Sequence, residues 1–207
     1  LVVNTIGLSR SGDRWFFIMD NLGNVAKLFI ELGVLNKTPR SGFLTIGIKQ
    51  TQSVAAHSFR TAVIGYVLAK LEGANADKVM KLCLFHDIPE ARIMDTHKVA
   101  RRYIDQKAAE EKVIAEQAAL LPKHVGDDVR ALWEEADAQK TKEAIIAKDA
   151  DYMEGILEAK EYKDNGNKYA QEWIDNWTAA LKTESAKKLA KLFDSSEVWW
   201  EGLKKFD

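Results

Sequence analysis

Cysteine and proline are scarce in this sequence of 207 residues. Cys83 is the only cysteine, so no disulfide can form within the chain, and a reducing compartment fits this composition. Its mostly apolar neighbours in KLCLFH favour a buried, unreactive thiol. Three prolines and the lack of a long Gly/Ser linker favour one compact domain. Strand-like alternation is nearly absent and helical periodicity dominates, so the sequence predicts an all-α fold.

The sequence also lacks a surplus of charge of either sign. Its 30 Lys and Arg residues balance 31 Asp and Glu residues, which leaves a formal net charge of -1. Without a strong field to attract an anionic polymer or lipid, a small-molecule substrate is favoured over nucleic acid or a membrane. No apolar run approaches the ~20 residues that cross a bilayer. The opening LVVNTIGLSRSGDRWFF is too short and too polar for a signal peptide, so we expect a cytoplasmic protein.

Apolar spacing predicts helices separated by short breaks. They are expected over about 21–32, 53–71, 77–85, 99–121, 128–136 and 140–162, with a loop over 37–52. We take 1–207 as one domain, with a helical core over about 21–165 and a tryptophan-rich helical extension over about 169–207. The tryptophans there are expected in core packing or a subunit interface. In the helix over 53–71, the stripe expected to face the core is Val54, Ala62, Val63, Tyr66, Val67 and Leu71.

Two histidines and two aspartates stand where a metal site between helices would need them. His57 lies in SVAAHSFR, His86 and Asp87 adjoin in CLFHDIPEA, and Asp151 lies in AKDADYME. Pro89 disfavours helical backbone at the residue before it, so the His86–Asp87 pair is expected at a helix end. Imidazole and carboxylate ligands together suit a borderline divalent metal, which can make water a nucleophile at neutral pH. These residues predict a metal-dependent hydrolase acting on phosphate esters.

Asp149 is a rival to Asp151 as the ligand from this last helix. Asp151 shares a face with Ala144, Ala147 and Gly155, whose small side chains let another helix approach closely. Asp149 lies on the apolar stripe of the same helix and therefore needs a buried partner. A salt bridge facing solvent is the alternative role for either acid.

In the order of these four residues, the chain resembles the HD-domain phosphohydrolases, and most closely their 5′-deoxynucleotidase branch. SVAAHS resembles that branch's S/N-V-x-E-H-S segment, HDIPEARIMD its HD-x-x-E-x-x-x-x-D segment, and KDAD its K-Q-A-D segment. KTPRSGF resembles a preceding loop in which an arginine contacts phosphate. The matched segments run from about 35 to 162.

The resemblance implies a helical HD-domain bundle, a homodimer, and one divalent metal ion held by His57, His86, Asp87 and Asp151. Mn, Co, Fe, Ni and Zn all accept two imidazoles and two carboxylates, so the identity of the metal stays open. The expected function is hydrolysis of nucleoside 5′-monophosphates, with deoxynucleotides among them, to nucleoside and phosphate.

Further roles follow residue by residue from the resemblance. Arg40 would hold the substrate phosphate, Glu90 would position or deprotonate the attacking water, and Asp95 would assist the leaving 5′-oxygen. Hydrolysis of a phosphate monoester requires this chemistry: a cation for the phosphate, a positioned water and an acid for the leaving group. The sequence leaves open which of Glu90 and Asp95 is the base and which the acid.

The chain departs from the branch around the phosphate loop. Ser41 follows Arg40 where bacterial members carry a tryptophan thought to shape sugar selection, and Phe43 is the nearest aromatic residue. We assign Phe43 to substrate binding, while the preference between deoxyribose and ribose stays open. Ala56 replaces an acid that commonly precedes the first histidine, which should tune the site without removing it.

The segment THKVARRY after Asp95 is unusually cationic. It contributes His97, Lys98, Arg101 and Arg102. One interpretation is a cationic rim over a phosphate pocket, with Lys98 binding substrate; the other is a solvated helix face.

Other functions compete with the monophosphatase. Within the same class, the substrate would be a nucleoside triphosphate or a cyclic nucleotide. A di-iron oxygenase would need extra histidines, for which His97 and His124 are the only candidates. A regulatory metal- or nucleotide-binding module would have lost a ligand or the Glu90/Asp95 pair, and neither is lost here. A purely structural helical scaffold ranks last.

Overall fold

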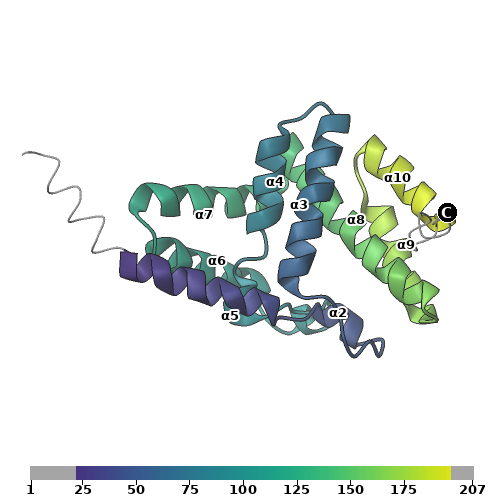
Figure 1. Ribbon diagram of the computed structural model, residues 1–207, viewed down its shortest axis with the longest axis horizontal. Helices are drawn as coiled ribbons and strands as arrows, with labels where there is room; N and C mark the ends of the chain where they lie inside the picture. The colour runs from purple at the N-terminus through teal and green to yellow at the C-terminus, as the bar shows by residue number, and fades with distance from the viewer. Residues whose placement is uncertain (1–21, 197–207) are drawn as a thin grey trace, which may run out of the picture.

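The computed structural model describes residues 22–196, and across that range the regular structure is helical, without a β-sheet (Figure 1). A single isolated bridge joins Pro39 to Ser53. The predicted all-α fold is therefore confirmed. No helix in the described range is long and apolar enough to cross a membrane.

The order of elements starts with a helix over 22–32. It continues with η1 (Gly33–Asn36), α2 (Ser41–Leu44), α3 (Val54–Leu71), α4 (Ala76–Phe85), α5 (Glu90–Ile93) and η2 (Ala100–Arg102). It ends with α6 (Gln106–Ala119), α7 (Lys123–Ala138), α8 (Lys142–Asp164), η3 (Lys168–Ala170), α9 (Gln171–Ala180) and α10 (Glu184–Ser195). In Figure 1, α3 and α4 occupy the centre, α6 and α7 the left, and α9 and α10 the right beside α8.

Polar caps explain where several helices begin. The Ser53 side chain accepts a hydrogen bond from the backbone N–H of Ala56 at the start of α3. At the start of α8, the Thr141 side chain accepts one from the backbone N–H of Ala144. The helix expected over 99–121 is wrong at its start. The chain makes only the short η2 there, and α6 begins after Asp105, whose side chain caps it. The expected loop over 37–52 contains the short α2, which the sequence did not predict.

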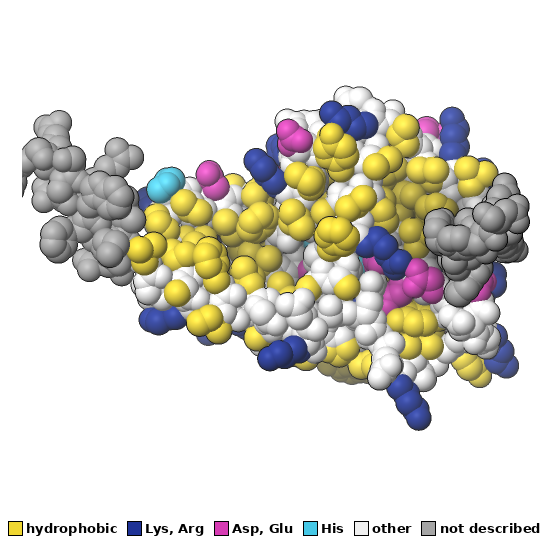
Figure 2. All heavy atoms as spheres, viewed as in Figure 1, with side chains coloured by type: hydrophobic (Ala, Val, Ile, Leu, Met, Phe, Trp, Pro, Cys, Tyr) yellow, Lys and Arg dark blue, Asp and Glu magenta, His cyan; other side chains and the backbone are white. Residues whose placement is uncertain are grey.

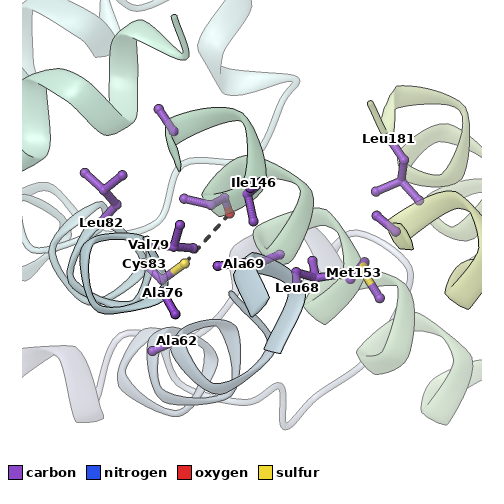
Figure 3. Packing of buried hydrophobic residues seen from close by; sticks show 14 of the residues in the cluster. Ala62, Leu68, Ala69, Ala76, Val79, Leu82, Cys83, Ile146, Met153 and Leu181 are labelled. Carbon is purple, nitrogen blue, oxygen red and sulfur yellow. Dashed lines mark hydrogen bonds between the residues drawn. The ribbon is translucent and has the colours of Figure 1, made fainter. Parts of the chain in front are cut away.

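The main core lies between α3, α4 and α8. Val79, Leu82 and Cys83 of α4 face Ile146 of α8, with Cys83 buried as predicted (Figure 3). Gly65 allows α3 to approach this closely, because a Cβ there would lie 2.7 Å from the Cys83 sulfur. This packing brings three separate chain segments together at one end of the core.

The stripe predicted to face the core on α3 is largely wrong. Val54 and Ala62 are buried, but Val63, Tyr66, Val67 and Leu71 are exposed. The buried face of α3 instead carries polar and small residues: His57, Ser58, Thr61 and Gly65 besides the apolar ones. The prediction from apolar spacing failed for α3 because the inward face of this helix carries polar residues, including His57, toward a polar cluster.

Asp149 is buried and finds hydrogen-bond partners at the start of α10. It accepts hydrogen bonds from the backbone N–H groups of Lys182 and Thr183 and from the Thr183 hydroxyl, at 2.7 to 3.1 Å. It thus anchors the chain at the start of α10, whose Ala186 and Ala190 join the main core. The remaining tryptophans of the tail, at positions 199 and 200, lie outside the described residues.

Candidate metal centre

The four residues expected to bind metal come together from three helices. His57 lies on the first turns of α3, His86 and Asp87 follow the last turn of α4, and Asp151 lies in the middle of α8. His86 is the C-terminal cap of α4, as the position of Pro89 predicted. Segments separated by about 30 and 65 residues in sequence thus meet in one cluster.

The ligand atoms of the cluster face one another. His57 Nε2 lies 3.1 Å from Asp151 Oδ1 and 3.6 Å from Asp87 Oδ2. His86 Nε2 lies 3.1 Å from Asp87 Oδ2 and 3.9 Å from Asp151 Oδ1. His57, His86 and Asp87 form a group with ligand atoms all within 4.8 Å of one another, and Asp151 reaches both imidazoles from α8.

Three atoms of this cluster lack hydrogen-bond partners although they are buried. Within the described range, His57 Nε2, His86 Nε2 and Asp87 Oδ2 have none. A buried polar atom without a partner costs about 1–3 kcal/mol. Three such atoms aimed at one point, from two imidazoles and a carboxylate, fit a divalent cation with mixed nitrogen and oxygen ligands.

Both imidazoles are oriented through their other ring nitrogen. His57 Nδ1 bonds to Glu154 Oε2, and His86 Nδ1 bonds to the backbone carbonyl of Cys83 at 2.7 Å. Such contacts fix a histidine so that its Nε2 is free for a metal. Glu154 was not predicted as part of the site, although it lies one helical turn after Asp151 and therefore on the same side of α8.

Glu154 is itself held in a buried polar network. The Nε atom of Arg60 donates to its Oε1 at 2.7 Å, and the Gln52 side-chain amide donates to the same atom at 2.6 Å. The Gln52 amide also donates to Glu158 Oε2 at 2.7 Å. The Gln52 carbonyl accepts the backbone N–H of Arg40 at 3.0 Å, so the network reaches the loop that carries Arg40.

The electrostatics of the cluster favour positive charge. Burial and Arg40 lower the pKa of His57, but Asp151 and Glu154 outweigh them and raise it to about 9. Burial raises the pKa of Asp87, yet His86, His57 and Arg40 bring it below its usual range. A cluster that binds a proton this readily is also one in which a metal ion can take the proton's place.

A cavity of about 630 Å³ opens beside the cluster. Arg40, His86, Asp87, Glu90 and Asp95 contribute to its lining, as do Phe43, Lys98 and Asp151. All the residues expected at the site except His57 therefore border one space, and His57 lies behind it at contact distance from Asp87 and Asp151.

Arg40 and the two further acids lie close to the expected metal ligands. Arg40 Nη1 is 3.8 Å from Asp87 Oδ2, and Asp95 Oδ2 accepts the backbone N–H of Ser41 at 2.7 Å. Glu90 is only 3 % exposed, and its Oε2 has no partner among the described residues. Burial, with Asp87 and Asp95 nearby, raises the pKa of Glu90 well above its usual range. A raised pKa makes the Glu90 carboxyl group a stronger base than an exposed glutamate.

A strained turn separates Glu90 from Asp95. Met94 ends α5 with φ 65° and ψ 165°, a region that essentially only glycine occupies, and its N–H donates to the Glu90 carbonyl at 3.0 Å. Its sulfur lies 3.8 Å from the Thr38 hydroxyl. The next residue, Asp95, contacts Ser41, which follows Arg40 in the chain.

Besides Arg40, the two other residues assigned to substrate binding, Phe43 and Lys98, occupy different parts of the cavity. Phe43 is 1 % exposed, and its ring packs on Tyr162, Trp173 and Trp177 with centroids 5.0 to 6.0 Å apart. It supports the wall from behind. Lys98, Arg101 and Arg102 are exposed and His97 is half-buried, and all four border the cavity. Among residues 22–196, none of the three Lys and Arg side chains pairs with an acid, which fits both a cationic rim and a solvated helix face.

The fold and the cluster are those of a metal-dependent phosphohydrolase. The chain belongs to the HD-domain family, whose sequence model matches residues 32–193. The 5′-deoxynucleotidase HDDC2 of Bos taurus is 32% identical over 146 residues, which cover 70% of this chain and 71% of that protein. HDDC2 of Homo sapiens is 33% identical over 138 residues, covering 66% and 67%.

Solved structures agree on the fold. A conserved hypothetical protein from Pyrococcus furiosus superposes with a TM-score of 0.68 at 29% identity, covering 83% of this chain and 99% of that one. The HD phosphohydrolase DatZ of cyanophage S-2L, solved with dA and one catalytic Zn²⁺ ion, gives a TM-score of 0.53 at 18% identity, covering 80% and 94%. At that identity the likeness concerns the fold alone.

Proposed function

We propose that this protein hydrolyses nucleoside 5′-monophosphates, deoxynucleotides among them, to nucleoside and orthophosphate. The observation that carries the proposal is the single cavity bordered by the His86–Asp87 pair, Asp151, Arg40 and two acids. A monoester substrate is supported by the relatives, which are named 5′-deoxynucleotidases.

His57, His86, Asp87 and Asp151 would hold one divalent metal, with Mn, Co, Fe, Ni and Zn all acceptable to this donor set. When bound, the metal supplies positive charge for the phosphoryl oxygens and makes water more acidic. The convergent, unpartnered atoms of three of these residues support the assignment.

The protein's own residues would carry the remaining steps. Arg40, buried among acids and 3.8 Å from Asp87, neutralises the phosphate and holds it over the cluster. Glu90, buried beside the cluster, and Asp95, held by the backbone N–H of Ser41, would share the proton transfers. One of them, as a carboxylate, takes a proton from the attacking water, and the other, as a carboxylic acid, gives one to the leaving 5′-oxygen.

The test is release of orthophosphate by metal-stripped protein resupplied with each divalent ion, against mono- and triphosphates of ribo- and deoxynucleosides. We expect metal-dependent orthophosphate from the monophosphates. Pyrophosphate or triphosphate released from the triphosphates alone would overturn the proposal in favour of another HD-type reaction. His86→Ala should lose bound metal, whereas the matched control His124→Ala, an exposed histidine on α7, should keep it.

We also propose that the protein is a homodimer that pairs through α3. Phe59, Val63, Val67 and Leu71 follow one another at intervals of four, so they form one stripe, and each is at least half exposed. Figure 2 shows apolar side chains gathered on this face. Exposed apolar patches of this kind mark association sites, and a two-fold axis lets one stripe pack on its own copy.

Light scattering after gel filtration tests the dimer. Wild-type protein should have the mass of a dimer, and the Val63→Glu variant the mass of a monomer. The Leu192→Glu variant, changed on the exposed side of α10, should remain a dimer. A monomeric wild type would refute the pairing. A cytoplasmic location completes the proposal, supported by the single, buried Cys83.

A further inference from the structure

One wall of the cavity comes from α9, a helix that carries none of the expected metal-binding, proton-transfer or phosphate-binding residues. Glu172, Trp173, Asn176 and Trp177 all line the cavity. They form two pairs spaced by four residues, so they present one continuous face of α9. Two indoles alternate on that face with an amide and a carboxylate.

The two indoles differ in what they contact. Trp177 packs into α8, because its ring would lie 2.7 Å from a Cβ at Gly155, so it anchors α9 to the core. Trp173 instead lies against the phosphate loop. Its Nε1 is 3.4 Å from the position of a Cβ at Gly42, two residues after Arg40, and its ring centroid is 5.9 Å from that of Phe43. Trp173 is only partly buried, which leaves indole surface facing the cavity.

The cavity is larger than a phosphate group requires. Its volume of about 630 Å³ falls among sites that enclose whole small molecules. The metal cluster and Arg40 account for the phosphate end. An aromatic face with an amide beside it is the chemistry that binds a nucleobase, by stacking and by hydrogen bonds to its polar edge. Asn176 is exposed, and no hydrogen bond engages its amide within residues 22–196.

We propose that α9 forms the nucleoside subsite of this enzyme, with Trp173 stacking on the base and Asn176 contacting its polar edge. The inference rests on the proposed function, since it places the nucleoside beside a phosphate held at Arg40. The aromatic surface reaches this place through the fold: α9 follows the phosphate loop by about 130 residues and packs against it.

The first experiment compares two substrates that share sugar and phosphate, a deoxynucleoside 5′-monophosphate and 2-deoxyribose 5-phosphate. Trp173→Leu keeps apolar bulk but removes the stacking surface. It should lower kcat/KM for the nucleotide about 5- to 150-fold, the effect of losing one base–aromatic stack, and lower kcat/KM for the base-free substrate much less. Trp173→Phe should restore most of the loss. Equal effects of Trp173→Leu on both substrates, or no effect on either, would overturn the subsite.

A binding measurement separates this inference from the proposed function. Titration calorimetry with deoxyadenosine involves no hydrolysis, so it reads the subsite even if no monophosphate is cleaved. Wild-type protein should bind the nucleoside, and Trp173→Leu should weaken that binding by the same factor as above. Wild-type protein that binds no nucleoside would refute the subsite, whereas absence of phosphate release would refute only the activity.

Asn176→Asp tests the contact to the base edge. The two side chains have the same shape, but the carboxylate accepts hydrogen bonds and cannot donate them. The ratio of kcat/KM between adenine and thymine nucleotides should change severalfold, while kcat/KM for 2-deoxyribose 5-phosphate stays constant. An unchanged ratio would remove Asn176 from the subsite.

Discussion

Replacing Met94 with glycine should stabilise the protein without slowing it. Of the two non-glycine residues with positive φ in the described range, Gln139 has an ordinary left-handed conformation, whereas Met94 lies in the region that only glycine favours. Such a conformation costs about 1–3 kcal/mol. Glycine removes that cost but gives the unfolded chain about 0.4–1 kcal/mol of extra freedom. The net gain is roughly 1 kcal/mol, which raises Tm by about 2–4 °C for a chain of this length.

Valine at the same position should do the reverse. Its branched Cβ makes the φ of Met94 costlier still, so the turn relaxes and the hydrogen bond from Ser41 to Asp95 breaks. A proton-transfer group contributes about 10²–10⁴-fold to rate. A displaced Asp95 should lose part of this contribution, so kcat should fall at least about tenfold. The metal content should stay unchanged.

The assay combines thermal unfolding, steady-state kinetics and metal analysis for wild type, Met94→Gly and Met94→Val. In an Asp95→Asn background, Met94→Val should no longer change kcat, because both changes act on the same group. A glycine variant less stable than wild type would refute the strain argument. A valine variant with wild-type kcat, or one that still slows the Asp95→Asn protein, would refute the link to Asp95.

Four further predictions concern residues of the site and of the core beside it. Glu154→Gln should weaken metal binding about 10- to 100-fold by freeing the His57 ring, measured by competition with a chelator; Glu184→Gln, an exposed acid on α10, should not. Glu90→Gln should keep the metal and lose nearly all turnover. Full activity of this variant would show that Glu90 takes no part in proton transfer. Asp149→Ala should lower the free energy of unfolding by about 1–3 kcal/mol, because three donors at Lys182 and Thr183 lose their acceptor; a neutral effect in denaturant titration would contradict that role. Burial raises the pKa of Cys83, so its thiol should resist an aromatic disulfide reagent at pH 8 until the protein unfolds.

Features governed by local chemistry were predictable from the sequence. Apolar spacing placed the helices over 53–71 and 140–162 close to the observed α3 and α8, and Pro89 placed the His86–Asp87 pair at a helix end. The convergence of that pair with Asp151 followed from the family resemblance.

Features that depend on distant segments were not predictable. The contact of Asp95 with Ser41 spans 54 residues, and the bond of His57 with Glu154 spans 97. No local pattern reports either one. The stripe on α3 was misjudged for a related reason, since its inward face carries His57 toward α8 and its apolar residues are left outside.

Two neighbouring acids on α8 tie the end of the chain to the centre of the site. Asp151 faces the histidines, while Asp149, two residues earlier, holds the backbone at the start of α10. A chain shortened before Lys182 would leave Asp149 in the core without its donors, two residues before Asp151 on the same helix. Asp149 would then have to take up a proton or move towards water, and a movement of α8 would displace Asp151 as well. The segment that begins α10 therefore helps to hold α8, and with it Asp151, in place, although α10 contributes no side chain to the cavity lining.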